Sequence, residues 1–428
     1  MPRPHLLRTT SQPDTILEHV TAGADLIVPL ANGEPAAVID ALEEHADRLE
    51  GVRIHQMHPL RTRRYMQGEF GDHLRHVSYF LSEANRQAYW DGHCDLVPNH
   101  FSEMPALLRG TTRCSMVLAA ASPPDRHGYF SLGTNADYVS SMIGRVPFYL
   151  EVNDRMPRTM GGNIVHVSDV AGWCQVDRPL LEVPPAVPGE DDHRIAALIA
   201  ERVPNGATLQ VGIGAIPNAV LSALADHDHL GLHTELLSDG VIDLVEAGAV
   251  TGARKLRRRN KHVGTFCLGT QRLYDWLDDN DGVEMLGVEW VNNPMIIGEQ
   301  PAFVSINATT EIDLMGQCAS ETMAGRYWSS SGGQSDFARG AMYSEGGQAF
   351  VVLHSQTRKG RSRVRSQLTP GSVVTTLKNT VDHVVTEHGL VELRGKSLAD
   401  RARLLISIAH PDHRETLERE AHELGLLR

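Results

Sequence analysis

Short apolar runs recur along the whole chain, and amphipathic stretches of helical length separate them. Runs rich in β-branched residues and bounded by glycine, proline or polar clusters are typical of buried strands. Stretches such as 35–49 and 216–226 instead carry apolar residues at helical spacing. We expect strands at residues 25–30, 52–57, 76–81, 96–101, 114–122, 146–152, 207–214, 233–239, 262–269, 282–291, 303–309, 350–355, 372–377 and 382–390. This alternation predicts an α/β fold with largely parallel sheets throughout the chain.

A proline-rich segment at 176–193 is the best place for a domain boundary. It contains four prolines and a charged cluster, which suit a linker and not a helix or strand interior. Because 428 residues exceed the usual size of one hydrophobic core, we expect two domains, 1–185 and 186–428. Each half contains a strand that leads into a turn with glycine and proline, at 26–42 and 209–224. Two copies of one α/β unit would place these turns near a shared cleft.

The charge balance argues against nucleic acid as a partner. The formal net charge is -13, with 53 Asp and Glu against 40 Lys and Arg, and this sign repels a phosphate backbone. A basic run at 254–262 is best interpreted as a solvated surface segment, although a local site for a phosphorylated cofactor stays open.

The cysteines and the apolar runs bear on the cellular compartment. The chain has 5 cysteines and no CxxC pair, so we expect neither a disulfide framework nor a zinc site. The first twenty residues lack an apolar stretch long enough for a signal peptide, and no window predicts a membrane span. We therefore expect a cytoplasmic protein with no membrane partner.

The stretch LQVGIGAIPNAV at 209–220 reads as a strand, a glycine turn and an apolar helix. Gly212 and Gly214 remove Cβ atoms where the strand meets the helix, so a ligand can approach the main chain and its free N–H groups. A dinucleotide fingerprint is the obvious alternative, which would make the chain a nucleotide-dependent dehydrogenase. It fits poorly, because Pro217 stands where that fingerprint has its third glycine.

A lone glutamate follows this turn one helix later. The spacing from Gly214 to Glu235 is enough for a helix and a loop, so Glu235 should lie at the carboxyl end of the strand beside the turn. A carboxylate in a dry site with donors aimed at a developing oxyanion can attack a thioester. The alternative is a surface or capping carboxylate.

A second glycine-rich segment spans residues 327–347. Its polar loop includes Ser329 and Gly333 and holds more backbone donors than a simple connection needs. This loop is either a plain turn or the other wall of an oxyanion site.

Three other features compete with this interpretation. Glu321 and Glu387 are carboxylates that also follow apolar runs, but a salt bridge or polar lining suits them better. Cys318 lacks a histidine partner by spacing and is expected to be a small buried residue. The HPDH stretch at 410–413 has metal-like spacing without further ligand types, so we expect a helix start and no metal site.

The chain resembles the acetyl-CoA hydrolase/transferase family of class I CoA-transferases, and within it the 4-hydroxybutyrate CoA-transferase branch. The motifs that carry this resemblance follow in order along nearly the whole sequence. They lie at residues 29–35, 122–138, 151–169, 211–220, 233–252, 305–321, 330–341 and 384–417. The resemblance implies two open α/β domains with the active site in the cleft between them, and a homodimer is expected.

The resemblance also implies roles for individual residues. Glu235, in the H-[ST]-E motif, would be the nucleophile, and Gly333 would supply an oxyanion N–H. Ser329, where other branches carry asparagine, would lie near coenzyme A. The turn expected to hold coenzyme A comprises Gly212, Ile213, Gly214, Ala215 and Ile216.

The implied reaction is an exchange of coenzyme A between an acyl-CoA and a small carboxylic acid such as 4-hydroxybutyrate, acetate or butyrate. It would follow a ping-pong mechanism through a glutamyl-CoA thioester, with coenzyme A as substrate and no permanently bound cofactor or metal. An acyl-CoA hydrolase on the same scaffold is the alternative, with water in place of the second acid.

Overall fold

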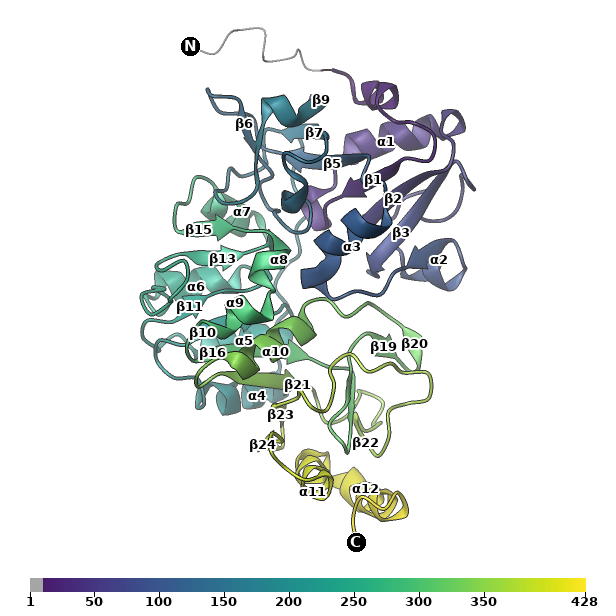
Figure 1. Ribbon diagram of the computed structural model, residues 1–428. Helices are drawn as coiled ribbons and strands as arrows, with labels where there is room; N and C mark the ends of the chain where they lie inside the picture. Colours follow the sequence, from purple (N-terminus) through teal and green to yellow (C-terminus); the bar gives the residue numbers. More distant parts are fainter. Residues whose placement is uncertain (1–10) are drawn as a thin grey trace. The chain divides into compact units, whose positions relative to one another are not determined.

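The computed structural model describes residues 11–428, and the chain forms two compact units (Figure 1). Unit 1 comprises Met1–Pro184 and Val263–Val291, and unit 2 comprises Pro185–His262 and Asn292–Arg428. The first ten residues of the segment that we examined for a signal peptide lie outside the described part.

The domain boundaries differ from the expected ones in one respect. The chain passes into unit 2 within the proline-rich segment, but Val263–Val291 returns to unit 1, whereas we expected 186–428 to be one continuous domain. Backbone hydrogen bonds explain the return: Thr265 O accepts from the N–H of Asp137, and Cys267 N donates to Thr134 O at 2.8 Å. Local apolar patterning cannot show which distant segment a strand will join.

A sheet of parallel strands forms the centre of unit 1. Its strands are β1 (Asp25–Val28), β2 (Val52–Met57), β3 (Leu74–Phe80), β4 (Cys94–Leu96), β5 (Met116–Ala121), β7 (Phe148–Asn153) and β9 (Val170–Val176). The spatial order is β4-β3-β2-β1-β5-β7-β9, with every neighbouring pair parallel. The order reverses at β1, because β2 lies on one side of it and β5 on the other.

Helices and short strands complete unit 1. The helices are α1 (Ala36–Glu44), α2 (Arg86–Trp90), α3 (Met104–Thr111), α7 (Gln271–Leu277) and α8 (Val288–Val291). The short strands are β6 (Tyr129–Ser131), β8 (Ile164–His166), β13 (His262–Gly264), β14 (Phe266–Cys267) and β15 (Val283–Met285). Val38 and Leu42, one helical turn apart on α1, pack with Leu26 and Ile54 of the sheet in a buried core.

Unit 2 is built on a second, mostly parallel sheet. Its strands are β10 (Thr208–Val211), β11 (Gly231–Leu232), β16 (Phe303–Ala308), β21 (Gln348–Val352), β23 (His383–Thr386) and β24 (Gly389–Glu392). The order is β11-β10-β16-β21-β23-β24, and only β24 runs antiparallel to its neighbour. Here the order reverses at β10, the strand that leads into the glycine turn.

Seven helices of unit 2 are α4 (Glu190–Ala200), α5 (Ala215–Ala223), α6 (Gly240–Glu246), α9 (Pro294–Gly298), α10 (Gln334–Tyr343), α11 (Leu398–Ile408) and α12 (Pro411–Glu423). Its short strands are β12 (Leu236–Leu237), β17 (Glu311–Asp313), β18 (Cys318–Ala319), β19 (Thr322–Met323), β20 (Arg326–Tyr327) and β22 (Val364–Arg365). Helix α4 packs against α5, and α9 against α10. Val351, Val384, Leu405 and Leu417 share a core that joins the sheet to α11 and α12.

Three expected strands are wrong in whole or in part. Residues 96–101 share only Leu96 with β4 and then leave the sheet. The other two are the segments 372–377 and 282–291. Residues 372–377 form no strand and contribute only an isolated bridge, between Thr376 and Cys318. Residues 282–291 begin as β15 but continue as helix α8. Both segments are rich in β-branched or apolar residues, and tertiary packing overrode their local preference.

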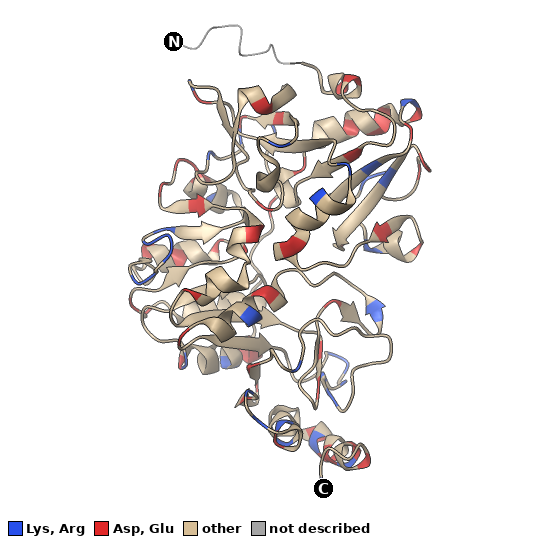
Figure 2. Ribbon diagram, viewed as in Figure 1, with Lys and Arg blue, Asp and Glu red and all other residues tan. Residues whose placement is uncertain are grey.

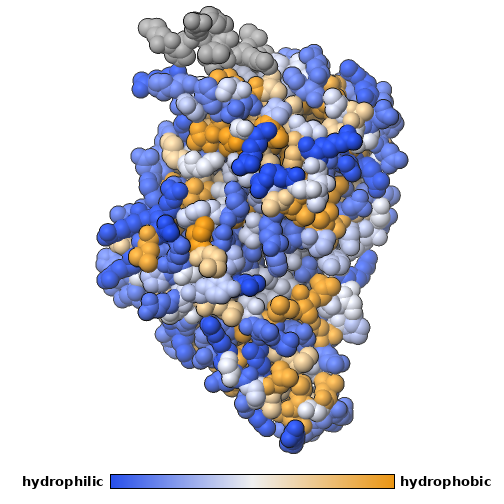
Figure 3. All heavy atoms as spheres, in the orientation of Figure 1, coloured by the Kyte–Doolittle hydropathy of each residue, from blue (hydrophilic) through white to orange (hydrophobic). Residues whose placement is uncertain are grey.

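Surface properties agree with the composition. Acidic and basic residues are interspersed along the ribbon in Figure 2. The basic run is largely exposed, as expected, except that Lys255 and His262 are buried. Lys255 donates from Nζ to the carbonyl oxygens of Leu232 and Lys261. Figure 3 shows patches of hydrophobic residues on the surface, among hydrophilic ones. Across residues 11–428, no helix is both long and apolar enough to cross a membrane.

Candidate active site

The glycine turn of unit 2 lies where its strand order reverses. In open α/β sheets, ligands bind outside the carboxyl ends of the strands at this point, because the flanking connections diverge and leave a crevice. Strand β10 ends at Val211, and α5 begins at Ala215 with Gly214 as its N-cap. The turn therefore stands at the position in unit 2 where a ligand site is most expected.

The backbone of the turn leaves room for a ligand. Gly214 has φ of 125°, a conformation that side chains disfavour. A Cβ added at Gly212 would meet no heavy atom within 4 Å, and one at Gly214 would meet only Pro217, at 3.8 Å. Ile213 is 48% exposed, whereas Ile216 is buried against the core. Of the five turn residues that we expected at the site, Ile216 thus supports the helix and the others border open space.

Glu235 lies beside this turn, as the spacing predicted. Strand β11 ends at Leu232 and pairs in parallel with β10, so both strands end at the same edge of the sheet. The hydroxyl of Thr234 donates to the carbonyl oxygen of Val211 at 3.2 Å. This bond ties the residue before Glu235 to the residue before Gly212.

Two segments distant in the chain approach the carboxylate of Glu235. The Nδ2 of Asn292 donates to Oε2 at 2.7 Å, and the main chain at Gly333 lies against the same oxygen, where it lowers the pKa of the carboxyl group. A Cβ built on Gly333 would overlap both Glu235 Oε2 and Asn292 Nδ2. Only glycine at 333 lets the main chain approach the carboxylate so closely.

Burial raises the pKa of Glu235 to about 7. The hydrogen bonds from Asn292 and Gly333 lower the pKa, while the negative charge of nearby Asp336 raises it. The side chain is half-buried, so it stays reachable from outside. A carboxyl group that titrates near neutral pH is more basic than an ordinary one and is a better nucleophile once it is ionised.

Glu321 holds the polar loop before α10 in place through hydrogen bonds. The Oε1 of Glu321 accepts from Ser331 at 3.3 Å and from Thr375 at 3.0 Å, and its carbonyl oxygen accepts from the N–H of Ser329 at 3.2 Å. The hydroxyl of Ser329 donates to the carbonyl of Ser330. Among residues 11–428, no hydrogen bond joins Ser329 to Glu235, so the structure brings Gly333, and not Ser329, to the carboxylate.

Asn292 is a site residue that the sequence did not reveal. It is fully buried between α8 and α9, and its Oδ1 finds no hydrogen-bond partner among residues 11–428. The neighbouring Asn293 is the one with a sequence signal, since it precedes Pro294 and caps α9 by accepting from Met295 N at 2.9 Å. Asn292 has no comparable signal, because its role comes from contact with a distant segment.

The competing features have structural roles. Glu387 accepts from the N–H and hydroxyl of Ser355, and Glu321 supports the loop described above. Cys318 is buried, as expected. At 410–413, His410 is the N-cap of α12, which confirms the predicted helix start.

This arrangement suits acyl transfer chemistry. A half-buried carboxylate accepts a hydrogen bond from Asn292 and lies against the main chain of Gly333, beside the turn that starts helix α5. Donors of this kind stabilise the negative charge that develops on a carbonyl oxygen during attack.

Comparison with protein families identifies the class of protein. The acetyl-CoA hydrolase/transferase N-terminal domain matches residues 5–182, and the acetyl-CoA hydrolase/transferase C-terminal domain matches residues 269–421. The chain belongs to the acetyl-CoA hydrolase/transferase family.

Two similar proteins that match over almost the whole chain are named CoA transferases, and a solved structure matches as widely. Succinyl-CoA:cyclohexane-1-carboxylate CoA transferase of Geobacter metallireducens is 42% identical over 410 residues, which are 95% of this chain and 93% of that protein. 4-Hydroxybutyrate coenzyme A transferase of Clostridium kluyveri is 40% identical, over 91% of this chain and 92% of that one. The crystal structure of RipA from Yersinia pestis is 35% identical and superposes with a TM-score of 0.92 over 98% of both chains.

Acetyl-CoA hydrolases match over a shorter part. The enzyme of Saccharomyces cerevisiae is 30% identical over 255 residues, which are 55% of this chain and 46% of that protein. The two transferases thus match over more than nine tenths of the chain, and the acetyl-CoA hydrolases over about half of it.

Proposed function

We propose that this protein is an acyl-CoA:carboxylate CoA-transferase with Glu235 as its nucleophile. The observation that carries the proposal is the Glu235 carboxylate itself, half-buried at the strand-order reversal of unit 2, hydrogen-bonded by Asn292 and close to the main chain of Gly333. The relatives that match over nine tenths of the chain support the reaction class.

The proposed reaction needs no proton transfer and no metal. The Glu235 carboxylate attacks the thioester carbonyl of an acyl-CoA, and the C–S bond breaks. The coenzyme A thiolate departs, and an acyl-glutamyl anhydride remains on the protein. The thiolate then attacks the glutamyl carbonyl, which releases the first acid as its carboxylate and forms a glutamyl-CoA thioester. A second carboxylate reverses both steps and leaves as the new acyl-CoA.

The donors around Glu235 have definite tasks in this scheme. Each attack places negative charge on a carbonyl oxygen, and a donor already in position stabilises that charge without reorganisation. In this proposal the amide of Asn292 and the N–H of Gly333 stabilise that charge when the glutamyl carbonyl is attacked, which the Asn292 hydrogen bond and the close approach of Gly333 support. The open turn at 212–215 would receive part of coenzyme A, whose binding away from the thioester positions the reacting carbonyl.

An exchange assay tests the proposal. The protein is incubated with acetyl-CoA or succinyl-CoA and a panel of small acids, and the new acyl-CoA is measured by chromatography. We expect exchange by the wild type, loss of roughly a thousandfold or more in Glu235→Gln, and retained exchange in the control Glu387→Gln. Full exchange by Glu235→Gln would refute the assignment.

Chemical trapping gives an independent test. Borohydride or hydroxylamine added with acyl-CoA should inactivate the wild type and modify the peptide that contains Glu235. The Glu235→Gln protein should show no modification. Modification of a different carboxylate, such as Glu321, would show that the nucleophile is that residue and not Glu235.

Hydrolysis of acyl-CoA is the second candidate, favoured by the partial match to an acetyl-CoA hydrolase. In that case water would resolve the intermediate, and free thiol would appear without any acceptor acid. The ratio of thiol release with and without added acid separates the two activities. The cytoplasmic location, the homodimer and the cleft between two domains stay predictions, and light scattering on the purified protein would test the dimer.

A further inference from the structure

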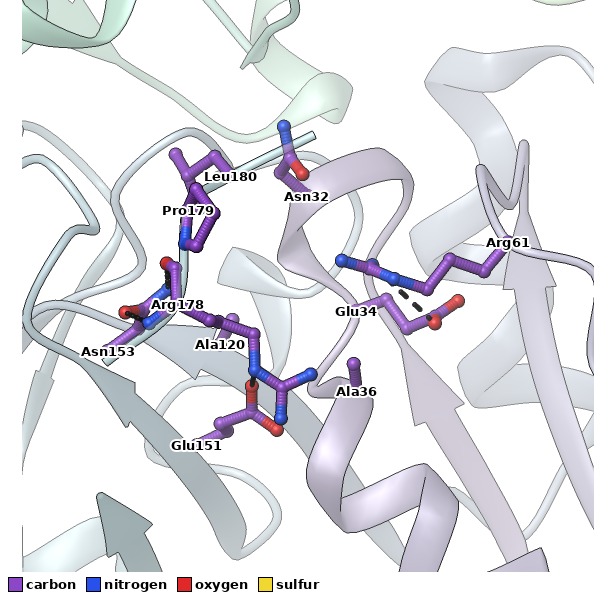
Figure 4. A pocket seen from close by; sticks show the side chains of 10 residues that line it. All are labelled: Asn32, Glu34, Ala36, Arg61, Ala120, Glu151, Asn153, Arg178, Pro179 and Leu180. Carbon is purple, nitrogen blue, oxygen red and sulfur yellow. Dashed lines mark hydrogen bonds and ion pairs between the residues drawn. The ribbon is translucent and has the colours of Figure 1, made fainter. Parts of the chain in front are cut away.

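The crevice where the strand order of unit 1 reverses is largely filled by its own side chains. Two arginines enter a small pocket there from opposite walls, as Figure 4 shows. Arg61 Nη1 lies 3.8 Å from Glu34 Oε1, and Arg178 Nε lies 3.5 Å from Glu151 Oε1. The cavity that remains is only ≈ 10 Å³, which is room for about one water molecule. It is too small to hold an acyl group.

The corresponding crevice of unit 2 is open over Gly212. Phe303, Ser305 and Asn307 alternate along β16 and point to one face of the sheet. Gln210 of β10 pairs with Ser305 in the parallel ladder, so Gln210 points to the same face. Gly212 follows Gln210 on this face, and a Cβ built on Gly212 would meet no heavy atom within 4 Å. A ligand can therefore approach the sheet above Gln210.

Glu235 borders this open position on the β11 side. Phe337 of α10 contacts both Phe303 of β16 and His233, with ring centroids 6.1 and 6.5 Å apart. Phe303 and His233 therefore point to the face that α10 covers. Glu235 comes two residues after His233, and Gly333, the N-cap of α10, lies against its carboxylate. The carboxylate thus lies on the same face as Gln210 and the open position.

Asn307 borders the open position on the β16 side, and a second amide fixes its orientation. Its Nδ2 donates to Gln210 Oε1 at 2.9 Å, and its Oδ1 accepts from Gln210 Nε2 at 3.2 Å. Gln210 is buried, whereas Asn307 is partly exposed near the carboxyl end of β16. Among residues 11–428 the Asn307 side chain makes no other hydrogen bond, so one of its N–H groups is left over. Exchanging oxygen and nitrogen in both amides preserves the pair and still leaves one N–H.

The distance across β10 suits a thioester carbonyl. Neighbouring strands lie about 4.8 Å apart, so β11 and β16, on either side of β10, are about 10 Å apart. An attacking oxygen lies about 3 Å from the carbonyl carbon, and a donor about 2.9 Å from the carbonyl oxygen. With the C=O bond of about 1.2 Å, nucleophile and donor are at most about 7 Å apart. Side chains on the two flanking strands can meet this requirement.

We infer that Asn307 donates its free N–H to the carbonyl oxygen of the acyl-CoA thioester, and that Gln210 is the positioning residue that holds Asn307 for this bond. The thioester carbonyl lies over Gly212, between Asn307 and the Glu235 carboxylate. As Glu235 attacks, a pair of carbonyl electrons moves to the oxygen, where the Asn307 N–H stabilises the charge. When the C–S bond breaks, the charge leaves with the thiolate and the carbonyl re-forms.

This role differs from that of Asn292 and Gly333, which in the proposed mechanism act on the carbonyl of Glu235 itself. Asn307 instead acts on the carbonyl of the substrate in the first attack. The inference rests on the proposed function, because it names the donor for that attack.

Two coenzyme A analogues test the contact without turnover. In acetyl-dethia-CoA a methylene replaces the thioester sulfur and the carbonyl stays, whereas S-ethyl-CoA has no carbonyl. By calorimetry we expect the wild type to bind the ketone roughly threefold to tenfold more tightly than the thioether. Asn307→Ala should lose this preference and bind S-ethyl-CoA as the wild type does.

Kinetics of the first half-reaction give the second readout. The enzyme is mixed with acetyl-CoA without an acceptor acid, and formation of the glutamyl-CoA thioester is followed in a single turnover. The rate should fall roughly tenfold to a hundredfold in Asn307→Ala, while the KM for acetyl-CoA changes less than twofold. Gln210→Met leaves the Asn307 donor without its orientation and should give a smaller fall in rate, again without a change in KM.

Ser305→Ala is the matched control. Ser305 lies on the same strand and face, two residues before Asn307, and its hydroxyl has no hydrogen-bond partner among residues 11–428. Its removal should leave both readouts at the wild-type value. If Asn307→Ala fails to fold, the double variant Gln210→Met with Asn307→Leu replaces both amides by apolar groups of similar shape and should show the same losses.

The outcomes separate this inference from the proposed function. A preference for the ketone that is kept in Asn307→Ala, or a half-reaction rate within twofold of the wild type, would overturn the inference. Equal weakening of both analogues would also overturn it, because Asn307 would then contact another part of coenzyme A. A ketone preference that depends on Asn307 supports the contact even if no exchange is found. Exchange by a wild type that shows no ketone preference overturns the contact and leaves the transferase assignment intact.

Discussion

The raised pKa of Glu235 makes its contribution to stability depend on pH. The carboxyl group has a pKa of about 7 in the folded protein, against an ordinary value of 4.5. Between these two values the folded state keeps a proton that the unfolded state has lost, so the free energy of unfolding falls as pH rises through this window. Below about pH 4.5 both states are protonated and the effect vanishes.

Replacing Glu235 by Gln removes this titration while it preserves the shape of the side chain. One pKa unit corresponds to about 1.4 kcal/mol, so the full shift gives an upper limit of about 3 kcal/mol above pH 7. Solvent screening of a half-buried group reduces this to about 2 kcal/mol. We therefore expect Glu235→Gln to gain about 2 kcal/mol relative to the wild type between about pH 5 and pH 8.

Denaturant unfolding of both proteins across this pH range measures the difference. In thermal scans the same gain corresponds to a shift of several degrees. Glu387→Gln is the matched control. Burial raises the pKa of Glu387, but hydrogen bonds from Ser355 lower it more, and the net pKa is lowered. Its stabilising effect is lost only as pH falls below about 4.5, so Glu387→Gln should differ from wild type by a constant amount over this range. A constant difference for Glu235→Gln as well would refute the reasoning.

Three further predictions concern Asn292, Gly333 and the five cysteines. Asn292→Ala should lower exchange roughly tenfold to a hundredfold. It should also move the acidic limb of the pH–rate profile to higher pH, because Glu235 loses a hydrogen-bond donor that lowers its pKa. The control Asn293→Ala removes only the N-cap of α9, so it should cost about 1 kcal/mol of stability and leave that limb in place. Gly333→Ala should abolish exchange, because the added Cβ would overlap the Glu235 carboxylate. In the control Gly110→Ala the added Cβ meets no atom within 4 Å, so this variant should keep its activity. Equal exchange activities of the two variants would contradict the close approach of Gly333 to Glu235. All five cysteines are buried and should react with a thiol reagent only upon unfolding, so fast labelling of the native protein would show that one is accessible.

The sequence revealed the parts of the site that depend on local order. Gly214 and Glu235 are separated by one helix and one strand, and parallel strands joined in this way end at the same edge of a sheet. Their proximity therefore followed from spacing alone. The apolar runs likewise predicted most strands of both sheets, because strands buried on both faces need continuous apolar side chains.

The remaining contacts join segments that are far apart in the chain. Asn292 reaches Glu235 from the end of α8, and Arg61 and Arg178 meet in one pocket from the ends of two strands at a distance in the sheet. No local pattern marks these residues, because an asparagine or arginine after an apolar run is usually a surface residue.

Local sequence by itself thus determined the α/β class, the glycine turn and the strand end that carries Glu235, since these depend on periodicity and short-range geometry. Tertiary structure alone decided that Val263–Val291 returns to unit 1, that the main chain at Gly333 touches the carboxylate, and that burial brings its pKa to about 7. The physical reason is that strand partners, desolvation and hydrogen-bond donors are set by packing among distant segments, which no window of the sequence contains.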